Sequence, residues 1–246
     1  MAKNNPSKVA SINLEGNLQR FINGDGKKNK GRHSEERYAS FDYCFNHFQS
    51  FRQANTIKGI ASQDRLQESC LQLGFYLASW GMLRGSSFLL EKSARNLVPL
   101  IEWVANCDKE YWAIDVDNYS DANIALLLKA KAEIKDVLGT HNNASDILAT
   151  KIMLGVFGNI PAFDNFFMKA FGFFYCKGNQ LKIISEFYRK PENKKVIDAW
   201  SDKIFTFDFF SGKETRLKYT KAKIVDMIGF IEGQRRTDLA KKKSTL

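Results

Sequence analysis

The sequence predicts a mostly α-helical, multi-helix globular domain. Apolar residues make up 44% of the 246 residues and aromatic residues 13%, a composition that can build a packed core. Apolar side chains recur at steps of three or four along most of the chain, and no ladder of alternating strands is visible. We expect a single domain over residues 1–246, with two helical lobes (about 38–120 and 121–233) as the alternative. The basic tail 234–246 has no apolar period and is expected to be frayed.

The first half of the chain contains two well-marked helices after a short first one. The polar, glycine-rich segment Asn23–Arg37 predicts a loop. Aromatic residues then recur on one face of Tyr38–Arg52, which indicates a helix. A second helix is expected over Ser62–Ser79. Ser62 begins a capping-box pattern that is only half satisfied, because the residue three positions later is Arg65. Between Phe88 and Asn106 helix alternates with irregular structure, and we expect a break at Pro99.

The second half begins with the strongest helical signal in the chain. Asp121–Val137 has a continuous apolar period, Ser120 is a suitable N-cap, and Gly139 is a suitable end. A further helix, Ala144–Phe157, follows a short polar hairpin. The remaining predicted helices are Asn165–Phe174, one ending at Lys190, one starting near Pro191, and one from Thr220 to about Gly233. Phe205–Phe210 is either a strand or a helix tail.

The charge of the chain favours a polyanionic partner. Lys and Arg number 37 against 27 Asp and Glu, which gives a formal net charge of +10. Such an excess is typical of proteins that bind DNA, RNA or an anionic membrane surface, although a protein that is merely basic fits it too. The basic runs are interpreted as solvated faces: Lys27–Arg32, Lys194–Lys195, Arg216–Lys223 and Arg235–Lys243.

Several classes of site and location are disfavoured. The four cysteines are widely spaced and lack zinc-ligand spacing, which suits free thiols in the cytoplasm. No signal-peptide pattern and no apolar run of membrane-spanning length is visible, so we expect a cytoplasmic protein without a membrane partner. No cofactor motif occurs, and no metal is predicted. The acidic cluster at Asp108, Glu110, Asp115 and Asp117 could hold a divalent ion, but a loop near a helix start is favoured.

The first candidate binding segment is Trp80–Ser87, directly after an apolar helix. Two glycines surround Arg84, with Trp80 and Met82 beside it. This combination presents a cation and a stacking surface, which suits a phosphate or a splayed base. The alternative is a helix C-terminus, with Trp80 in the core and Arg84 capping carbonyls.

The second candidate segment runs from Gly139 to Asp164. A helix, a polar hairpin, a second helix and a Pro-containing turn that delivers Asp164 follow one another, and this order resembles the helix-hairpin-helix DNA glycosylases. The resemblance implies that the hairpin amides hold a DNA phosphate and that Asp164, 25 positions after Gly139 (164 − 139), faces a flipped nucleotide. The implied DNA-binding residues are Gly139, Thr140, His141, Asn142, Asn143 and Lys151, together with Arg84. The implied base pocket is formed by Trp80, Met82, Asn159, Phe163 and Phe167.

The hairpin departs from the family pattern in two ways. Relatives usually carry Pro-Gly-apolar-Gly, whereas Leu138–His141 has one glycine only. Strand-cutting relatives keep a lysine nucleophile after the glycines, where this chain has Asn142 and Asn143. The resemblance therefore implies a monofunctional enzyme that leaves an abasic site. The patterns WGMxRG and FGNxPAFD together also resemble uncharacterised bacterial sequences, and some bacterial helix-hairpin-helix-like proteins act in defence against phages, a link by analogy.

The residues around Asp164 support the same interpretation independently. A carboxylate among Phe163, Phe166 and Phe167 would be partly desolvated, which raises its pKa and strengthens its attraction to a cation. It could stabilise an oxocarbenium-like sugar or orient a water. Asp164 is equally suited to cap the helix that begins at Asn165, and one residue can do both. The neighbouring aromatic residues favour a core over a stacking platform.

Three functions follow from these observations. The leading one is excision of a normal or modified base from DNA by N-glycosidic cleavage. The second is a DNA- or RNA-binding module without catalysis. The third is an interaction or defence protein whose charge is incidental. An Asp164 in an aromatic cleft that faces basic surface would favour the first, and an Asp164 that only caps a helix on a closed surface would favour the second.

Overall fold

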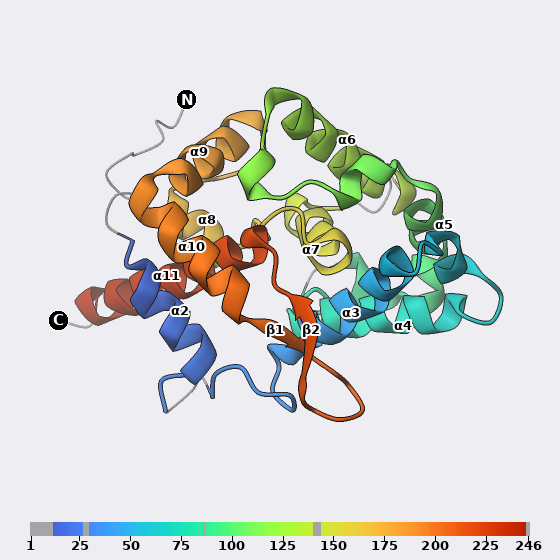
Figure 1. Cartoon of the computed structure of the whole chain (residues 1–246), viewed down its shortest axis with the longest axis horizontal. Helices are drawn as coiled ribbons and strands as arrows, with labels where there is room; N and C mark the ends of the chain where they lie inside the picture. Colours follow the sequence, from blue (N-terminus) through green and yellow to red (C-terminus); the bar gives the residue numbers. More distant parts are fainter. Residues whose placement is uncertain (1–11, 27–29, 86, 140–143, 245–246) are drawn as a thin grey trace.

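The computed structural model describes residues 12–26, 30–85, 87–139 and 144–244. This part of the chain is mostly helical, which confirms the predicted fold class, and helices surround a central helix, α7 (Figure 1). The α-helices are α2 (Leu14–Asn23), α3 (Ala39–Gln53), α4 (Leu66–Ser79), α5 (Val98–Asn106), α6 (Asp121–Val137), α7 (Asp146–Phe157), α8 (Asn165–Phe171), α9 (Gly178–Arg189), α10 (Pro191–Lys203) and α11 (Lys221–Ser244). The 3-10 helices are η1 (Ile57–Ala61), η2 (Phe88–Glu91), η3 (Ala94–Leu97), η4 (Lys109–Trp112) and η5 (Val116–Asn118).

Helix α7 forms the centre of the core. Every residue from Leu148 to Phe157 is buried, and only Thr150 and Lys151 among them are polar, so this part of the helix is apolar on nearly all sides. Ser145 caps its start by accepting the Leu148 N–H at 3.2 Å, and Gly158 ends it in the left-handed conformation, with a φ of 69°. Helices α3, α4 and α6 all pack against it. Buried apolar side chains from both of the predicted lobes belong to one hydrophobic cluster.

Helix α6 confirms its prediction residue for residue. It spans Asp121–Val137, and the Ser120 hydroxyl accepts the Asn123 N–H at 3.1 Å. Two features of the first half of the chain differ from the prediction. Helix α4 begins at Leu66 without a side-chain cap, because the Ser62 hydroxyl donates to the Gly59 carbonyl instead. Pro99 lies in the first turn of α5 and does not break a helix, since a proline there lacks only an N–H that would have no partner.

A small antiparallel hairpin settles the ambiguous segment Phe205–Phe210. Phe205–Phe207 forms strand β1, which pairs with β2, Glu214–Lys218. Phe205 lies opposite Lys218 and Phe207 opposite Glu214, and the register is irregular between these two residue pairs. Strand β2 was not predicted, because it is polar and lies at the surface. A buried carboxylate, Asp42 on α3, fixes the hairpin: it accepts the Phe207 N–H at 3.0 Å and pairs with Arg32 at 2.8 Å.

Helices α11 and α8 approach each other closely, and this corrects the predicted end of the last helix. Gly233 was expected to end it, but α11 continues to Ser244. A Cβ on Gly233 would lie 2.0 Å from the Phe166 carbonyl oxygen, and one on Gly229 would lie 2.4 Å from the Phe167 ring. The two glycines therefore mark the contact with α8 and not a helix end. Helix α8 itself is shorter than predicted, because Gly172 ends it in the left-handed conformation.

Candidate functional site

The indole of Trp80 forms the wall of the candidate site. It follows α4, stacks on the Tyr38 ring with centroids 5.5 Å apart, and meets the Phe230 ring edge-on at 5.4 Å. Three cationic groups surround it: the Lys223 Nζ lies 5.2 Å, the Arg37 Cζ 5.3 Å and the Lys151 Nζ 5.9 Å from the centre of the ring system. Cation–π attraction stabilises all three cations at this ring.

Lys151 enters the site from the central helix. Its side chain is buried, and its Nζ donates a hydrogen bond of 2.7 Å to the Trp80 carbonyl. Burial lowers the pKa of Lys151, whereas the negative charges of Asp164 and Asp226 raise it. The amine therefore points inward in this conformation, and a contact of Lys151 with DNA stays a prediction.

The pair formed by Lys223 and Asp226 completes the charged cluster. Both side chains are buried, one turn apart on α11, and their ion pair measures 2.9 Å. The other oxygen of Asp226 accepts the Ala162 N–H at 3.0 Å, so α11 holds the turn that precedes α8. Lys223 had been assigned to a solvated basic run, and its burial corrects that assignment. The sequence signal for this pair was the spacing of Lys223 and Asp226, which lie at i and i+3 in a helix that is otherwise mostly apolar there.

The turn between α7 and α8 positions Asp164 through hydrogen bonds to neighbouring elements. Gly158 opens the turn with a positive φ. The Asn159 amide donates to the Tyr111 carbonyl at 2.9 Å, and the Phe163 N–H donates to the Thr150 hydroxyl at 3.0 Å. The Asn159 side chain thereby connects the turn to η4, and the buried Phe163 N–H finds its acceptor on α7.

Asp164 caps α8, as one of the two interpretations expected. Its Oδ1 accepts the N–H groups of Phe166 at 3.0 Å and Phe167 at 2.9 Å. Its Oδ2 accepts no hydrogen bond from any described residue. Burial raises the pKa of Asp164, and the positive charge of Lys151 lowers it, although the two side chains form no direct ion pair. One carboxylate oxygen therefore has a structural role and the other is left for further contacts.

A small cavity lies between these groups. It is lined by Tyr76, Trp80, Lys151, Leu154, Ala162, Asp164, Lys223, Asp226 and Phe230. Its volume is about 10 Å³, which is room for about one water molecule. A nucleotide base does not fit into this space unless the surrounding segments move.

Two exposed arginines lie on the outer side of the cavity. Arg37 stands over the Trp80 ring, and Arg84 folds back over Gly81, where a Cβ would lie 2.9 Å from its Nε. The charges of both arginines contribute to the lowered pKa of Lys151, which places them near the amine. The guanidinium of Arg84 donates no hydrogen bond to the described helix ends, so the carbonyl capping that was the alternative for this residue is not observed.

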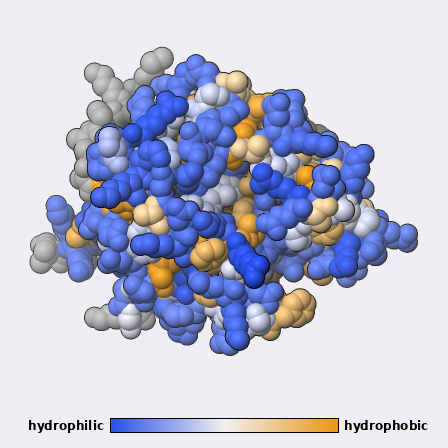
Figure 2. All heavy atoms as spheres, in the orientation of Figure 1, coloured by the Kyte–Doolittle hydropathy of each residue, from blue (hydrophilic) through white to orange (hydrophobic). Residues whose placement is uncertain are grey.

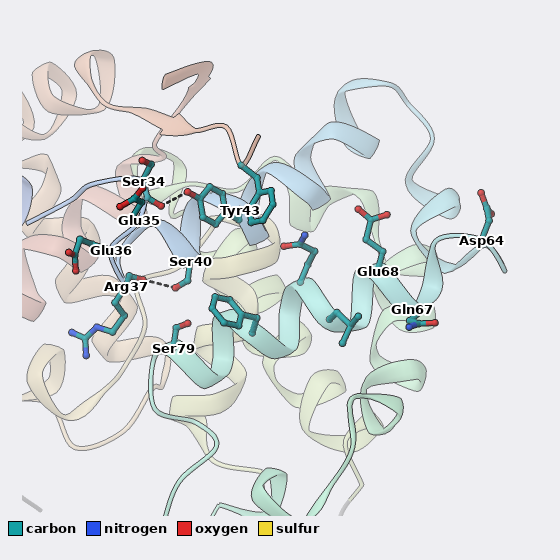
Figure 3. A pocket seen from close by; sticks show the side chains of 14 residues that line it. Ser34, Glu35, Glu36, Arg37, Ser40, Tyr43, Asp64, Gln67, Glu68 and Ser79 are labelled. Carbon is teal, nitrogen blue, oxygen red and sulfur yellow. Dashed lines mark hydrogen bonds between the residues drawn. The ribbon is translucent and has the colours of Figure 1, made fainter. Parts of the chain in front are cut away.

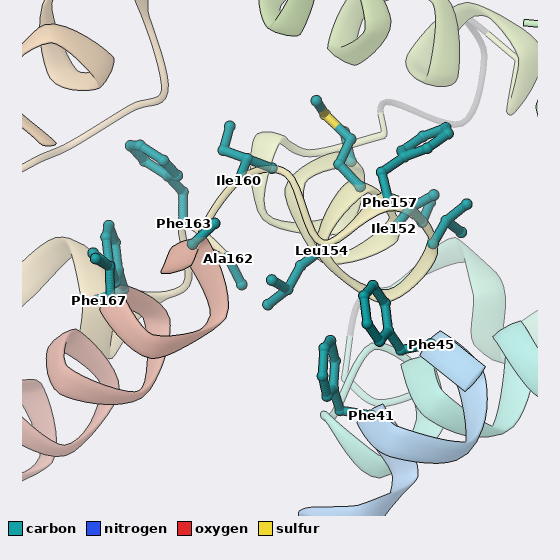
Figure 4. Packing of buried hydrophobic residues seen from close by; sticks show 14 of the residues in the cluster. Phe41, Phe45, Ile152, Leu154, Phe157, Ile160, Ala162, Phe163 and Phe167 are labelled. Carbon is teal, nitrogen blue, oxygen red and sulfur yellow. The ribbon is translucent and has the colours of Figure 1, made fainter. Parts of the chain in front are cut away.

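Most of the predicted base pocket belongs to the core. Phe163 and Phe167 are fully buried with ring centroids 5.3 Å apart, among other apolar side chains (Figure 4). Asn159 is buried as well, and Met82 is half-buried against the core. Of these four, none lines the cavity described above, which corrects the expectation that they surround a base in this conformation. Among the base-pocket residues, Trp80 alone lines it.

The predicted hairpin can be described only at its edge. Gly139 follows α6 with a φ of 93°, in the left-handed region that suits a helix end. Thr140, His141, Asn142 and Asn143 lie outside the described residues. The phosphate-binding role of this segment stays a prediction.

A second cluster of titratable groups lies between α3 and α4. His47 Nε2 is 2.8 Å from the Ser69 hydroxyl, and His47 Nδ1 is 3.8 Å from a Glu68 carboxylate oxygen. The order of these groups resembles a catalytic triad, with Ser69 in the place of the nucleophile, His47 of the base and Glu68 of the acid. Ser69 is fully buried, however, and its hydroxyl donates to the Ile60 carbonyl at 2.8 Å. This cluster therefore joins two helices and offers no accessible nucleophile.

The acidic cluster around Asp115 is a helix start, as favoured from the sequence. The Asp115 carboxylate accepts the N–H groups of Lys221 at 2.8 Å and Ala222 at 2.7 Å, the first residues of α11. Asp117 forms an ion pair with the Lys221 side chain. Across residues 12–26, 30–85, 87–139 and 144–244, no group of three acidic, histidine or cysteine side chains is placed to hold a metal ion.

Comparisons of the chain with known proteins give no match. No protein-family model, no curated protein and no solved structure matches it. None of the helices in the described part of the chain combines the length and the apolar character that a membrane span requires. The resemblance to helix-hairpin-helix glycosylases stays a prediction.

Proposed function

We propose that this protein is a DNA glycosylase-like enzyme that cleaves an N-glycosidic bond, with Asp164 as its carboxylate. The observation that carries the proposal is the convergence of Asp164 and Lys151 behind Trp80, at a point flanked by exposed arginines. N-glycosidic cleavage passes through an oxocarbenium-like sugar, which a carboxylate can stabilise directly or through an oriented water. The unused oxygen of Asp164 is available for either role, and its low-dielectric surroundings strengthen the attraction.

The groups outside the cavity suit a nucleic-acid substrate. Arg37 and Arg84 can contact phosphates on either side of an extruded nucleotide, and the indole of Trp80 offers a face on which a base can stack. Entry of the base requires the segment after α4 to move. Gly81 and Gly85 have φ values of 75° and 61°, and these two glycines bracket the moving segment as hinges.

The proposed reaction is hydrolysis that leaves an abasic site in an uncut strand. Lys151 donates to the Trp80 carbonyl, and its positive charge lowers the pKa of Asp164 against the larger rise that burial causes. The alternative is that Lys151 acts as an amine nucleophile, since its pKa is lowered by burial. Borohydride distinguishes the two: hydrolysis gives no trapped complex, whereas a covalent adduct lost in Lys151→Met would establish the lysine mechanism.

The decisive experiment is incubation with duplex and single-stranded DNA that contains normal or modified bases, followed by alkali to reveal abasic sites. Asp164→Asn should fold and bind DNA but release no base, because Asn caps helices about as well as Asp. Asp108→Asn is the matched control, since Asp108 caps η4 away from the site and accepts the Glu110 N–H at 3.0 Å. Full base release by Asp164→Asn would exclude this carboxylate from the mechanism.

A nucleic-acid-binding module without catalysis is the second candidate. It is favoured by the small volume of the cavity and by the capping role of Asp164. In that case the wild type should bind DNA with an affinity that falls by orders of magnitude between low and moderate salt, and no substrate should lose a base. Absence of binding even at low salt would remove both candidates and leave an interaction or defence protein.

A further inference from the structure

A surface groove shares Arg37 with the Trp80 site, because Arg37 lines the groove and also lies over the Trp80 ring. Its volume is about 860 Å³, and it follows α4 from Ser79 and Arg37 at one end to Asp64 and Gln67 at the other (Figure 3). Fourteen residues line it: Ser34, Glu35, Glu36, Arg37, Ser40, Tyr43, Asp64, Gln67, Glu68, Leu71, Gln72, Phe75, Ser79 and Phe209. We call this the α4 groove.

The floor of the α4 groove is apolar. Leu71 and Phe75 are 51% and 66% exposed, one turn apart on the outer face of α4. Phe209, 66% exposed, reaches in from the β1–β2 hairpin, where its ring meets the Tyr43 ring edge-on at 5.1 Å. The face of the molecule seen in Figure 2, in the same orientation as Figure 1, is mainly hydrophilic with scattered apolar side chains. Large side chains of this kind, gathered along one groove, mark a protein-binding surface.

The rim of the α4 groove is acidic, in contrast to the net charge of +10 of the chain. Four carboxylates line it, those of Glu35, Glu36, Asp64 and Glu68, against one lining cation. Lys30 pairs with Glu36 at 2.9 Å and Arg65 with Glu68 at 3.0 Å, but both cations are more than half exposed. Exposed pairs of this kind contribute little and exchange readily for the cations of a partner. The same carboxylates repel the phosphates of a nucleic acid.

We propose that the α4 groove binds an amphipathic helical segment of a partner protein that carries apolar anchors flanked by Lys or Arg. The apolar floor accepts anchors spaced by one helical turn, and the acidic rim selects for basic flanks. Arg37 lies at the end of the groove and also over Trp80. A bound segment therefore reaches a residue of the proposed DNA-binding surface, and the partner and DNA compete.

The test uses a synthetic 18-residue helical peptide of Leu and Lys as a probe, with a Leu and Glu peptide of the same pattern as its counterpart. Fluorescence anisotropy should show binding of the Leu and Lys peptide only. Phe75→Ser should weaken it at least tenfold, and Glu68→Lys with Glu35→Lys should abolish it. Leu90→Ser is the matched control, because Leu90 is 56% exposed outside the groove and its loss should change nothing.

Several results would overturn the proposal, and none of them depends on base release. Failure of the Leu and Lys peptide to bind, equal binding of both peptides, or unchanged binding in Phe75→Ser each refutes it. Self-association of the wild type that Phe75→Ser abolishes, seen by sedimentation, would assign the groove to a second copy of this chain. A loss of DNA affinity in Phe75→Ser would assign it to the nucleic-acid surface instead.

Discussion

The contact between α8 and α11 predicts that Gly233→Ala destabilises the protein even though Ala favours helices. The added Cβ would lie 2.0 Å from the Phe166 carbonyl oxygen and 2.4 Å from its carbonyl carbon. These are backbone atoms in the first turn of α8, so no side-chain rotation relieves the clash and the two helices must separate. Overpacking of this kind costs about 1–3 kcal/mol or more, against a gain in helix propensity of about 1 kcal/mol. Because the clashing atoms are backbone atoms, we expect a cost at the upper end of this range, about 3 kcal/mol, and therefore a net loss of about 2 kcal/mol.

Urea and thermal denaturation would measure this loss. A destabilisation of about 2 kcal/mol corresponds to a fall in Tm of roughly 4–8 °C in a domain of this size. Gly74→Ala in α4 is the matched control: its Cβ would meet the nearest atom, in Leu97, at an ordinary 3.5 Å. That variant should gain about 0.5–1 kcal/mol. A Gly233→Ala protein as stable as the Gly74→Ala protein would refute the close approach of α8 and α11.

Three further predictions concern single side chains. Burial raises the pKa of Asp115 from 3.8 to about 6. Between about pH 4 and 6 the folded protein therefore keeps a proton on Asp115 that the unfolded chain has released. The free energy of unfolding falls as the pH rises through this window. Asp115→Asn removes this titration, so urea denaturation at several pH values should show a decrease in unfolding free energy that is smaller than in the wild type by about 2–3 kcal/mol. Asp164→Ala should lose about 1 kcal/mol of stability through the missing cap, whereas Asp164→Asn should melt near the wild type. Arg84→Ala should weaken DNA binding at an unchanged Tm; intact binding with a lowered Tm would give Arg84 a structural role.

The helix boundaries show which local signals decide a fold and which are ambiguous. Helix α6 was predicted to the residue because Ser120 caps it and its apolar period is unbroken. Gly233 misled because a glycine that ends a helix and a glycine that lets two helices approach look the same in sequence. Pro99 misled for a related reason, since proline both breaks a helix interior and favours a first turn.

The candidate site was predictable in part. Trp80 and Asp164 stood out by their local context, and the structure brings both to one cavity. Lys223 and Asp226 were missed because only the packing of α11 places them there. Phe163 was assigned to a base pocket because it precedes the carboxylate, yet a residue just before a helix cap commonly turns into the core.

The interleaving of early and late segments has a consequence for how the protein folds. The Ala162 amide finds its acceptor 64 residues later, on Asp226, and Asn17 donates to Glu232 across 215 residues at 3.3 Å. Helical proteins usually fold fast because their contacts are local, but these contacts require closure of long loops. During synthesis the turn that carries Asp164 lacks its hydrogen bond to Asp226 until α11 has emerged. We therefore expect a slower folding step than the helical content suggests, and no stable folded intermediate formed by the first 200 residues alone.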